Sequence, residues 1–86
     1  MAYRVEIRRQ ARKELARIEA EARQRIAQAI DALGDDPRPP GCKKLQGSPY
    51  WRIRVGVYRV IYQVEEGRLL VLVLEVGHRK EVYRKR

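Results

Sequence analysis

Residues 50–64, Tyr50-Trp-Arg-Ile-Arg-Val-Gly-Val-Tyr-Arg-Val-Ile-Tyr-Gln-Val64, hold the clearest pattern in the chain. Apolar and polar residues alternate around Gly56-Val57, and a two-residue turn with glycine first is typical of a type II′ β-hairpin. Such a turn determines which residues of the two strands lie opposite each other. One face of the hairpin then consists of apolar pairs: Val55 with Tyr58, Ile53 with Val60, and Trp51 with Tyr62. We therefore predict a hairpin with one face in the core.

The other face of the same hairpin is basic. Arg54 falls directly opposite Arg59, and Arg52 lies beside them, across from Ile61. Like charges that face each other in a sheet are destabilising, and a bound polyanion would relieve that cost. A solvated face is the ordinary explanation for one arginine. Three together, with no acid between residues 38 and 63, favour phosphate binding.

The charge of the whole chain is concentrated in its second part. The 86 residues carry 20 Lys and Arg against 11 Asp and Glu, a formal net charge of +9. Residues 38–86 hold 12 of the cations and 4 of the acids, so this part alone carries +8. With 44% hydrophobic residues the chain can still build a core, and its length predicts one domain, residues 1–86. Lys43 and Lys44 are weaker candidates for phosphate binding, because a lysine pair in a loop is usually just surface.

Composition excludes several classes of protein. The single cysteine, Cys42, and the single histidine, His78, cannot form an internal disulfide or a four-ligand zinc site. No apolar run approaches the roughly 20 residues of a membrane span, and the N-terminus lacks the apolar core of a signal peptide. Glycine-rich phosphate loops and the common hydrolase motifs are absent as well. We expect a cytoplasmic protein with no metal, no cofactor and no membrane contact.

The first 49 residues predict a strand, two helices and a connection. Residues 3–8 alternate with period two, as a half-buried strand does, and residues 11–33 carry apolar residues at helical spacing. One unbroken helix of that length would be roughly 36 Å long, so we expect a break near residues 19–21 that gives two antiparallel helices. Gly34 is expected to end the second helix. Residues 34–49 hold all four prolines and are expected to form a loop.

The last part of the chain completes an α+β fold. Beyond the hairpin, residues 68–76 are nearly all apolar, as in a central strand buried on both faces, and Val82 and Tyr83 suggest a short last strand. We predict an N-terminal strand and a two-helix hairpin that pack on an antiparallel sheet of four or five strands.

The segment Gly77-His-Arg-Lys-Glu-Val-Tyr83 follows the central strand and carries titratable groups. Together with the basic hairpin face, His78, Arg79 and Tyr83 supply the residue types needed for RNA cleavage without a metal: a base for the ribose 2′-OH, an acid for the leaving oxygen, and fixed cations. Arginine stays charged and cannot be the base. The base is therefore His78 or Tyr83, and the sequence leaves both open. Alone, each is more often an ordinary surface or packing residue.

The chain resembles the RelE/ParE superfamily of toxin-antitoxin toxins, and its RelE branch in particular. The resemblance covers nearly the whole chain and rests on segments in a fixed order: Tyr3-Arg-Val-Glu-Ile7, Asp36-Pro-Arg38, Lys44-Leu-Gln-Gly47, Tyr58-Arg-Val-Ile-Tyr62 and Val76-Gly-His-Arg-Lys-Glu-Val-Tyr83. It implies a fold like that of microbial ribonucleases, and metal-independent cleavage of mRNA in the ribosomal A site that leaves 2′,3′-cyclic phosphate ends and inhibits translation.

The resemblance also implies roles for single residues. Arg59 falls on a phosphate ligand, Arg79 on the residue that stabilises the transition state and protonates the leaving oxygen, and Tyr83 on a tyrosine that orients the base or transfers a proton. Arg52 and Arg54 stand where the best-known member has lysines, which puts a general-base role at these positions in doubt. His78, where that member has lysine, is our candidate for the missing proton acceptor.

The resemblance implies partners too. They are a cognate antitoxin encoded nearby, the ribosome and its mRNA, and operator DNA only through the toxin-antitoxin complex. Two other functions remain open: a ParE-like toxin that inhibits DNA gyrase without hydrolysis, and a small basic RNA-binding domain without catalysis. The set Arg59, Arg79 and Tyr83 on a basic sheet face favours the ribonuclease.

Overall fold

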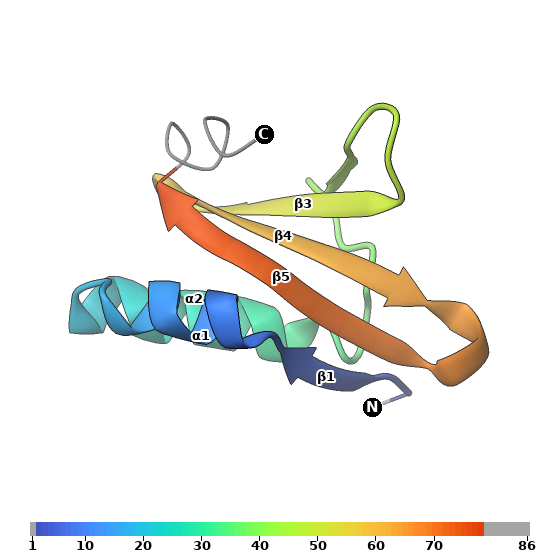
Figure 1. The fold of residues 1–86 in the computed structure, drawn as a ribbon, viewed down its shortest axis with the longest axis horizontal. Helices are drawn as coiled ribbons and strands as arrows, with labels where there is room; N and C mark the ends of the chain where they lie inside the picture. The colour runs from blue at the N-terminus through green and yellow to red at the C-terminus, as the bar shows by residue number, and fades with distance from the viewer. Residues whose placement is uncertain (1, 79–86) are drawn as a thin grey trace.

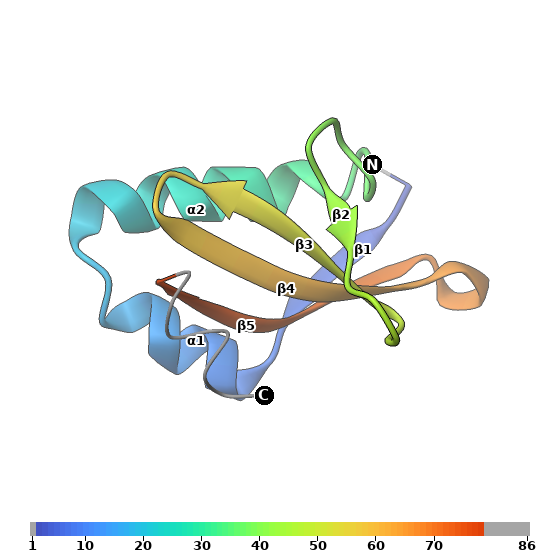
Figure 2. The same cartoon turned by 90° about the horizontal axis from the view of Figure 1, so that it is seen from above.

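Two helices lie on one side of a five-stranded sheet in the computed structural model, which describes residues 2–78 (Figures 1 and 2). The strands are in the order β1-β5-β4-β3-β2 across the sheet. In chain order the elements are β1 (Arg4–Ile7), α1 (Arg9–Ala16), α2 (Ala20–Ala32), β2 (Lys43–Lys44), β3 (Tyr50–Val55), β4 (Tyr58–Glu65), a single turn of 3-10 helix η1 (Glu66–Arg68), and β5 (Leu70–His78). The predicted α+β architecture is confirmed.

The hairpin of β3 and β4 has the predicted register. Val55 pairs with Tyr58, Ile53 with Val60, and Trp51 with Tyr62. Gly56 has a φ of +61°, and Val57 does not share the left-handed conformation, as a type II′ turn requires. The turn therefore directs one set of side chains to the helices and the other set to the opposite face.

The sheet is mixed, so the prediction of an antiparallel sheet is wrong for one pair of strands. β1 runs parallel to β5, with Arg4 opposite Leu70 and Ile7 opposite Val73. Two antiparallel strands can be joined by a tight turn, whereas parallel neighbours need a long crossover connection. The helices and the hairpin strands lie between β1 and β5 in the chain and supply that length. β5 is central, as predicted, between β1 and β4.

The two helices are separated slightly earlier than predicted, at residues 17–19 rather than 19–21. The break needs neither glycine nor proline, because Glu19 caps the second helix. Its side chain accepts a hydrogen bond of 2.7 Å from the backbone N–H of Ala22. Gly34, the predicted stop, directly follows the helix cap Leu33 and its carbonyl accepts a hydrogen bond from the N–H of Tyr3. The end of α2 is thereby tied to the start of β1.

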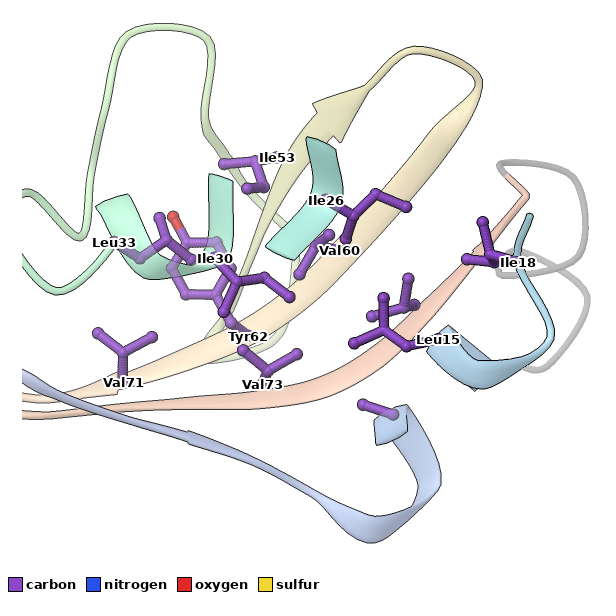
Figure 3. Packing of buried hydrophobic residues seen from close by; sticks show 12 residues of the cluster. Leu15, Ile18, Ile26, Ile30, Leu33, Ile53, Val60, Tyr62, Val71 and Val73 are labelled. Carbon is purple, nitrogen blue, oxygen red and sulfur yellow. The ribbon is translucent and has the colours of Figure 1, made fainter. Parts of the chain in front are cut away.

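The core lies between the helices and the sheet. Figure 3 shows Ile30 of α2 and the cap residue Leu33 beside the ring of Tyr62, and Ile26 of α2 beside Val60. Tyr62 is fully buried, and its hydroxyl donates a hydrogen bond of 2.6 Å to the carbonyl oxygen of Pro37. This bond satisfies the polar end of a side chain whose ring fills the centre of the core.

The proline-rich connection contains a strand that the sequence did not predict. Lys43 and Lys44 form β2, which pairs with Arg52 and Trp51 of β3. Two residues are too few to show alternation, so only the pairing itself reveals the strand. The predicted short strand at Val82 and Tyr83 lies outside the described residues. Within residues 2–78, no helix is long and apolar enough to span a membrane.

Candidate nucleic-acid interface

Arg52, Arg54 and Arg59 lie on the side of the sheet that faces away from the helices, and we call this surface the arginine face. The register confirms that Arg54 is directly opposite Arg59 and that Arg52 is opposite Ile61. Ile53 and Val60, their chain neighbours, point to the other side and belong to the core. Because the helices all lie on that other side, no helix of the described chain covers the arginine face (Figure 1).

The three arginines differ in exposure. Arg54 is exposed, whereas Arg52 and Arg59 are only 6% and 4% exposed. A solvated face would leave all three side chains in water, so the ordinary explanation for surface arginines does not fit two of them. Charged groups are expensive to bury unless other groups compensate them. Arg54 is thus the arginine of this face that is open to solvent, while Arg52 and Arg59 are enclosed by neighbouring groups.

Glu75 brings a carboxylate to the same face, which sequence reasoning missed. It lies opposite Ile61, in one cross-strand row with Arg52. Continued alternation from Val71 and Val73 would place Glu75 in the core. A β-bulge at this point adds one residue to β5, since Tyr62 pairs with Val73 but Ile61 pairs with Glu75. The bulge therefore redirects the side chain of Glu75 to the arginine face, a common function of bulges.

The lysine pair of β2 is divided between the two faces. Lys43 pairs with Arg52 and extends the row on the arginine face, while Lys44 pairs with Trp51 on the helix side. Both side chains are exposed. Only Lys43 thus joins the predicted phosphate-binding set.

His78 is on the helix side of the sheet. It pairs with Tyr58, and the two rings meet edge to face with centroids 6.1 Å apart and an interplanar angle of 74°. Its chain neighbour Gly77 is the residue opposite Arg59. The structure therefore does not bring His78 together with the three arginines. Arg79 and Tyr83, the other predicted catalytic residues, lie outside the described residues.

Arg38, the first cation of the acid-free stretch between residues 38 and 63, has a structural role. Its guanidinium lies 2.6 Å from a carboxylate oxygen of Glu66 and 5.2 Å from the ring centre of Trp51. Glu66 also accepts a hydrogen bond from the hydroxyl of Tyr3. These two contacts, that with Tyr3 first, lower the pKa of Glu66. Arg38 thus joins the loop after α2 to the β4–β5 turn and is not part of the arginine face.

The arrangement suits a phosphate ester better than a metal ion. Within residues 2–78, no group of three or more metal-ligating side chains lies together. Guanidinium groups bind phosphate oxygens in pairs and remain charged at every physiological pH. The arginine face can therefore hold a phosphate and stabilise added negative charge on it.

Comparisons with known proteins agree with this fold. The model of a family described as the ParE toxin of type II toxin-antitoxin systems matches residues 5–83. A RelE-like toxin protein of Escherichia coli is 29% identical over 82 residues, which cover 93% of this chain and 86% of that protein. The chain therefore belongs to the ParE toxin family of type II toxin-antitoxin systems.

Solved structures place it with the RelE toxins. RelE from the RelE-RelB complex of Pyrococcus horikoshii is 32% identical, with a TM-score of 0.82 over 92% of this chain and 97% of that one. The isolated RelE toxin of Escherichia coli is 29% identical, with a TM-score of 0.79 over 98% of this chain and 94% of that one. The protein is a RelE-like toxin.

Proposed function

We propose that this protein is a ribosome-dependent endoribonuclease that cleaves mRNA in the ribosomal A site and so inhibits translation. The observation that carries the proposal is the arginine face, in which Arg52, Arg54 and Arg59 lie together on one side of a sheet of RelE type, with Arg54 exposed. A neutral or basic partner would not offset the repulsion between Arg54 and Arg59, whereas the negative charge of an RNA phosphate would.

The proposed reaction needs no metal. The ribose 2′-oxygen attacks the adjacent phosphorus while a base takes its proton, and the bond from phosphorus to the 5′-oxygen breaks as an acid protonates that oxygen. The products are a 2′,3′-cyclic phosphate and a 5′-hydroxyl. In this proposal Arg59 and Arg54 hold the phosphate and stabilise its extra charge, with Arg52 and Lys43 beside them.

Proton transfer is assigned to residues near the end of the chain. Arg79 is proposed to protonate the leaving oxygen, and Tyr83 or His78 to accept the proton of the 2′-OH. The position of His78 on the helix side favours Tyr83 for that role. Replacing each of the two separately and measuring cleavage against pH distinguishes them, because only removal of the true base changes the profile.

The protein is proposed to act in the cytoplasm and to be held inactive by an antitoxin. Its relatives from Pyrococcus horikoshii and Escherichia coli were solved as complexes with RelB. An acidic partner segment complements a chain of net charge +9. We propose that binding to operator DNA occurs only through that complex.

A gyrase inhibitor is the second candidate, because the family model that matches is described by its ParE members. That function would use the same fold for binding alone. It predicts loss of DNA supercoiling with intact mRNA, the opposite of what the ribonuclease predicts.

The deciding experiment incubates the purified protein with translating ribosomes and a defined mRNA, and maps cuts by primer extension. We expect cuts within codons that carry 2′,3′-cyclic phosphate ends. Arg54→Ala should reduce the cleavage rate by about 100-fold, as loss of one charge-stabilising group does. Arg4→Ala is the matched control, because Arg4 is an exposed strand arginine engaged with Glu6. Intact mRNA together with inhibited gyrase would refute the ribonuclease.

A further inference from the structure

The outer side of α1 carries a second group of cations, separate from the arginine face. Arg9, Lys13 and Arg17 are spaced four residues apart, so they follow one line along the helix and its C-terminal cap. All three are exposed, while Ala11 and Leu15 on the opposite side pack into the core. We call these three residues the α1 stripe. At 1.5 Å per residue the stripe is about 12 Å long.

No acid of α1 offsets this charge. Its one carboxylate, Glu14, points to the sheet, where it accepts a hydrogen bond of 2.8 Å from the backbone N–H of Val76. That N–H lies on the part of β5 that does not pair with β1, so Glu14 accepts the hydrogen bond of a backbone N–H at the edge of the sheet. Among the described residues, none forms an ion pair with a member of the α1 stripe.

The cations at the start of α1 work against the helix. Its N-cap, Arg8, makes no side-chain capping bond, and its first turn contains no acid. Cations near a helix N-terminus oppose the helix dipole, and like charges four residues apart repel. The neighbouring helix α2 has the usual arrangement, with Glu19 as cap and Glu21 paired to Arg25. Lys13 in the last turn and Arg17 at the C-cap suit the helix dipole, so what folding leaves unexplained in α1 is the cation at Arg9 and the like-charge spacing of the stripe.

The surface chemistry of the stripe favours RNA over a protein partner. Protein interfaces use large apolar or aromatic anchors at their centre. The exposed large apolar side chains of the described chain are Val57 and Leu69, and neither lies on α1. A row of cations without such an anchor matches a phosphate backbone.

We propose that the α1 stripe binds the phosphate backbone of folded RNA that surrounds the cleaved strand. α1 lies under the sheet, and the arginine face is on the other side (Figure 1). A single extended strand on the arginine face does not reach α1, but a folded RNA that encloses the protein touches both. Under the proposed function this RNA is ribosomal. The inference therefore rests on the proposed function.

Binding of the full-length protein to two probes tests the proposal: purified ribosomes and a single-stranded RNA of six nucleotides. The test variant is Arg9→Gln/Lys13→Gln/Arg17→Gln. We expect its affinity for ribosomes to fall about tenfold or more. The slope of log affinity against log salt concentration should decrease by the equivalent of about two to three phosphate contacts. Its affinity for the short RNA should be unchanged. Arg25→Gln is the control, since Arg25 is an exposed helix arginine that already pairs with Glu21.

A second variant separates binding from folding. Arg9→Glu places an acid in the first turn of α1, four residues before Lys13, so its melting temperature should equal or exceed that of the parent while ribosome binding falls. Unchanged ribosome binding in both variants overturns the proposal. An equal loss on the short RNA also overturns it, because the stripe would then lie on the path of the substrate strand. Loss of antitoxin binding alone would assign α1 to a protein contact and overturn it too. Binding is measured without cleavage, so failure of the ribonuclease proposal is seen separately.

Discussion

At the scale of single residues, Glu75 controls the charge of the arginine face. Two cross-strand rows hold the three arginines, and Glu75 is the only acid in those rows among residues 2–78. It is half-buried, and its row partner Arg52 is buried. A carboxylate in this place reduces repulsion between cations that water does not screen well.

Replacing Glu75 by glutamine should therefore destabilise the free protein. Because the side chain is only half-buried, we expect a loss of about 1–2 kcal/mol in the free energy of unfolding, below the cost of breaking a fully buried pair. Inorganic phosphate should restore part of that loss, since the anion replaces the missing charge. Urea unfolding with and without phosphate measures both effects. Glu65→Gln, which removes a half-buried partner of the exposed Arg68, is the control. Equal stability of Glu75→Gln and the parent protein would show that Glu75 does not compensate the arginines.

Tyr62 gives a pH dependence that a single substitution can isolate. Burial, the largest cause, raises the pKa of Tyr62 in the folded protein above its ordinary value near 10. Above that pH the unfolded chain loses a proton that the folded protein keeps, so stability falls as pH rises. Tyr62→Phe removes this dependence, and it costs about 1 kcal/mol at neutral pH through the lost hydrogen bond to Pro37. Urea unfolding between pH 8 and pH 11 tests the difference in slope. Parallel curves for the two proteins would contradict it.

At the scale of elements, the β3–β4 turn depends on the conformation of Gly56. Its φ of +61° is costly for residues with a β-carbon. No atom lies within 4 Å of the position that a β-carbon would take, so the cost of substitution is conformational and not steric. Gly56→Ala should lose about 1–2 kcal/mol of stability, and Gly56→Asn less, because asparagine tolerates this region better. Thermal unfolding of both variants makes the comparison, and an alanine variant as stable as the asparagine variant would argue against the cause.

The elements also show which features sequence patterns can predict. The hairpin follows from local turn chemistry and strict alternation, so its pairs could be read with confidence from residues 50–64. The parallel pairing of β1 with β5 depends on contacts between residues more than 60 positions apart, which alternation does not encode. The bulge in β5 is equally hidden, because residues 70–76 are apolar on both faces except for Glu75. The orientation of Glu75 could therefore not be predicted, and its arrival at the candidate site was missed.

At the scale of the whole molecule, summed charges conceal how the cations are arranged. The first 37 residues have a net charge of only +1, yet residues 8–17 carry five cations and one acid. The acids that balance this sum lie mainly on α2 and in the loop after it. Cations and acids are separated in the fold. Cations lie on two sides of it, in the arginine face and the α1 stripe, while acidic groups cap and pair within α2. The arginine face was predicted from the sequence, because the register of two strands could be worked out. The α1 stripe was not, because the net charge of the first 37 residues is close to zero.

A protein with this charge distribution should become more stable as ionic strength rises. Net charge far from zero destabilises a compact state through self-repulsion. Salt at about 0.1 M largely screens the repulsion between exposed charges that are more than about 10 Å apart. We expect the free energy of unfolding to rise between 10 and 300 mM sodium chloride, and phosphate to exceed chloride at equal ionic strength because it also binds the arginine face. Arg54→Gln should be more stable than the parent at low salt by about 0.2–1 kcal/mol, since it removes the charge directly opposite Arg59. The same variant should gain less from phosphate. Equal gains from phosphate and chloride in the parent protein would mean that the arginines are screened but do not bind the anion, and would remove the physical basis for placing an RNA phosphate on this face.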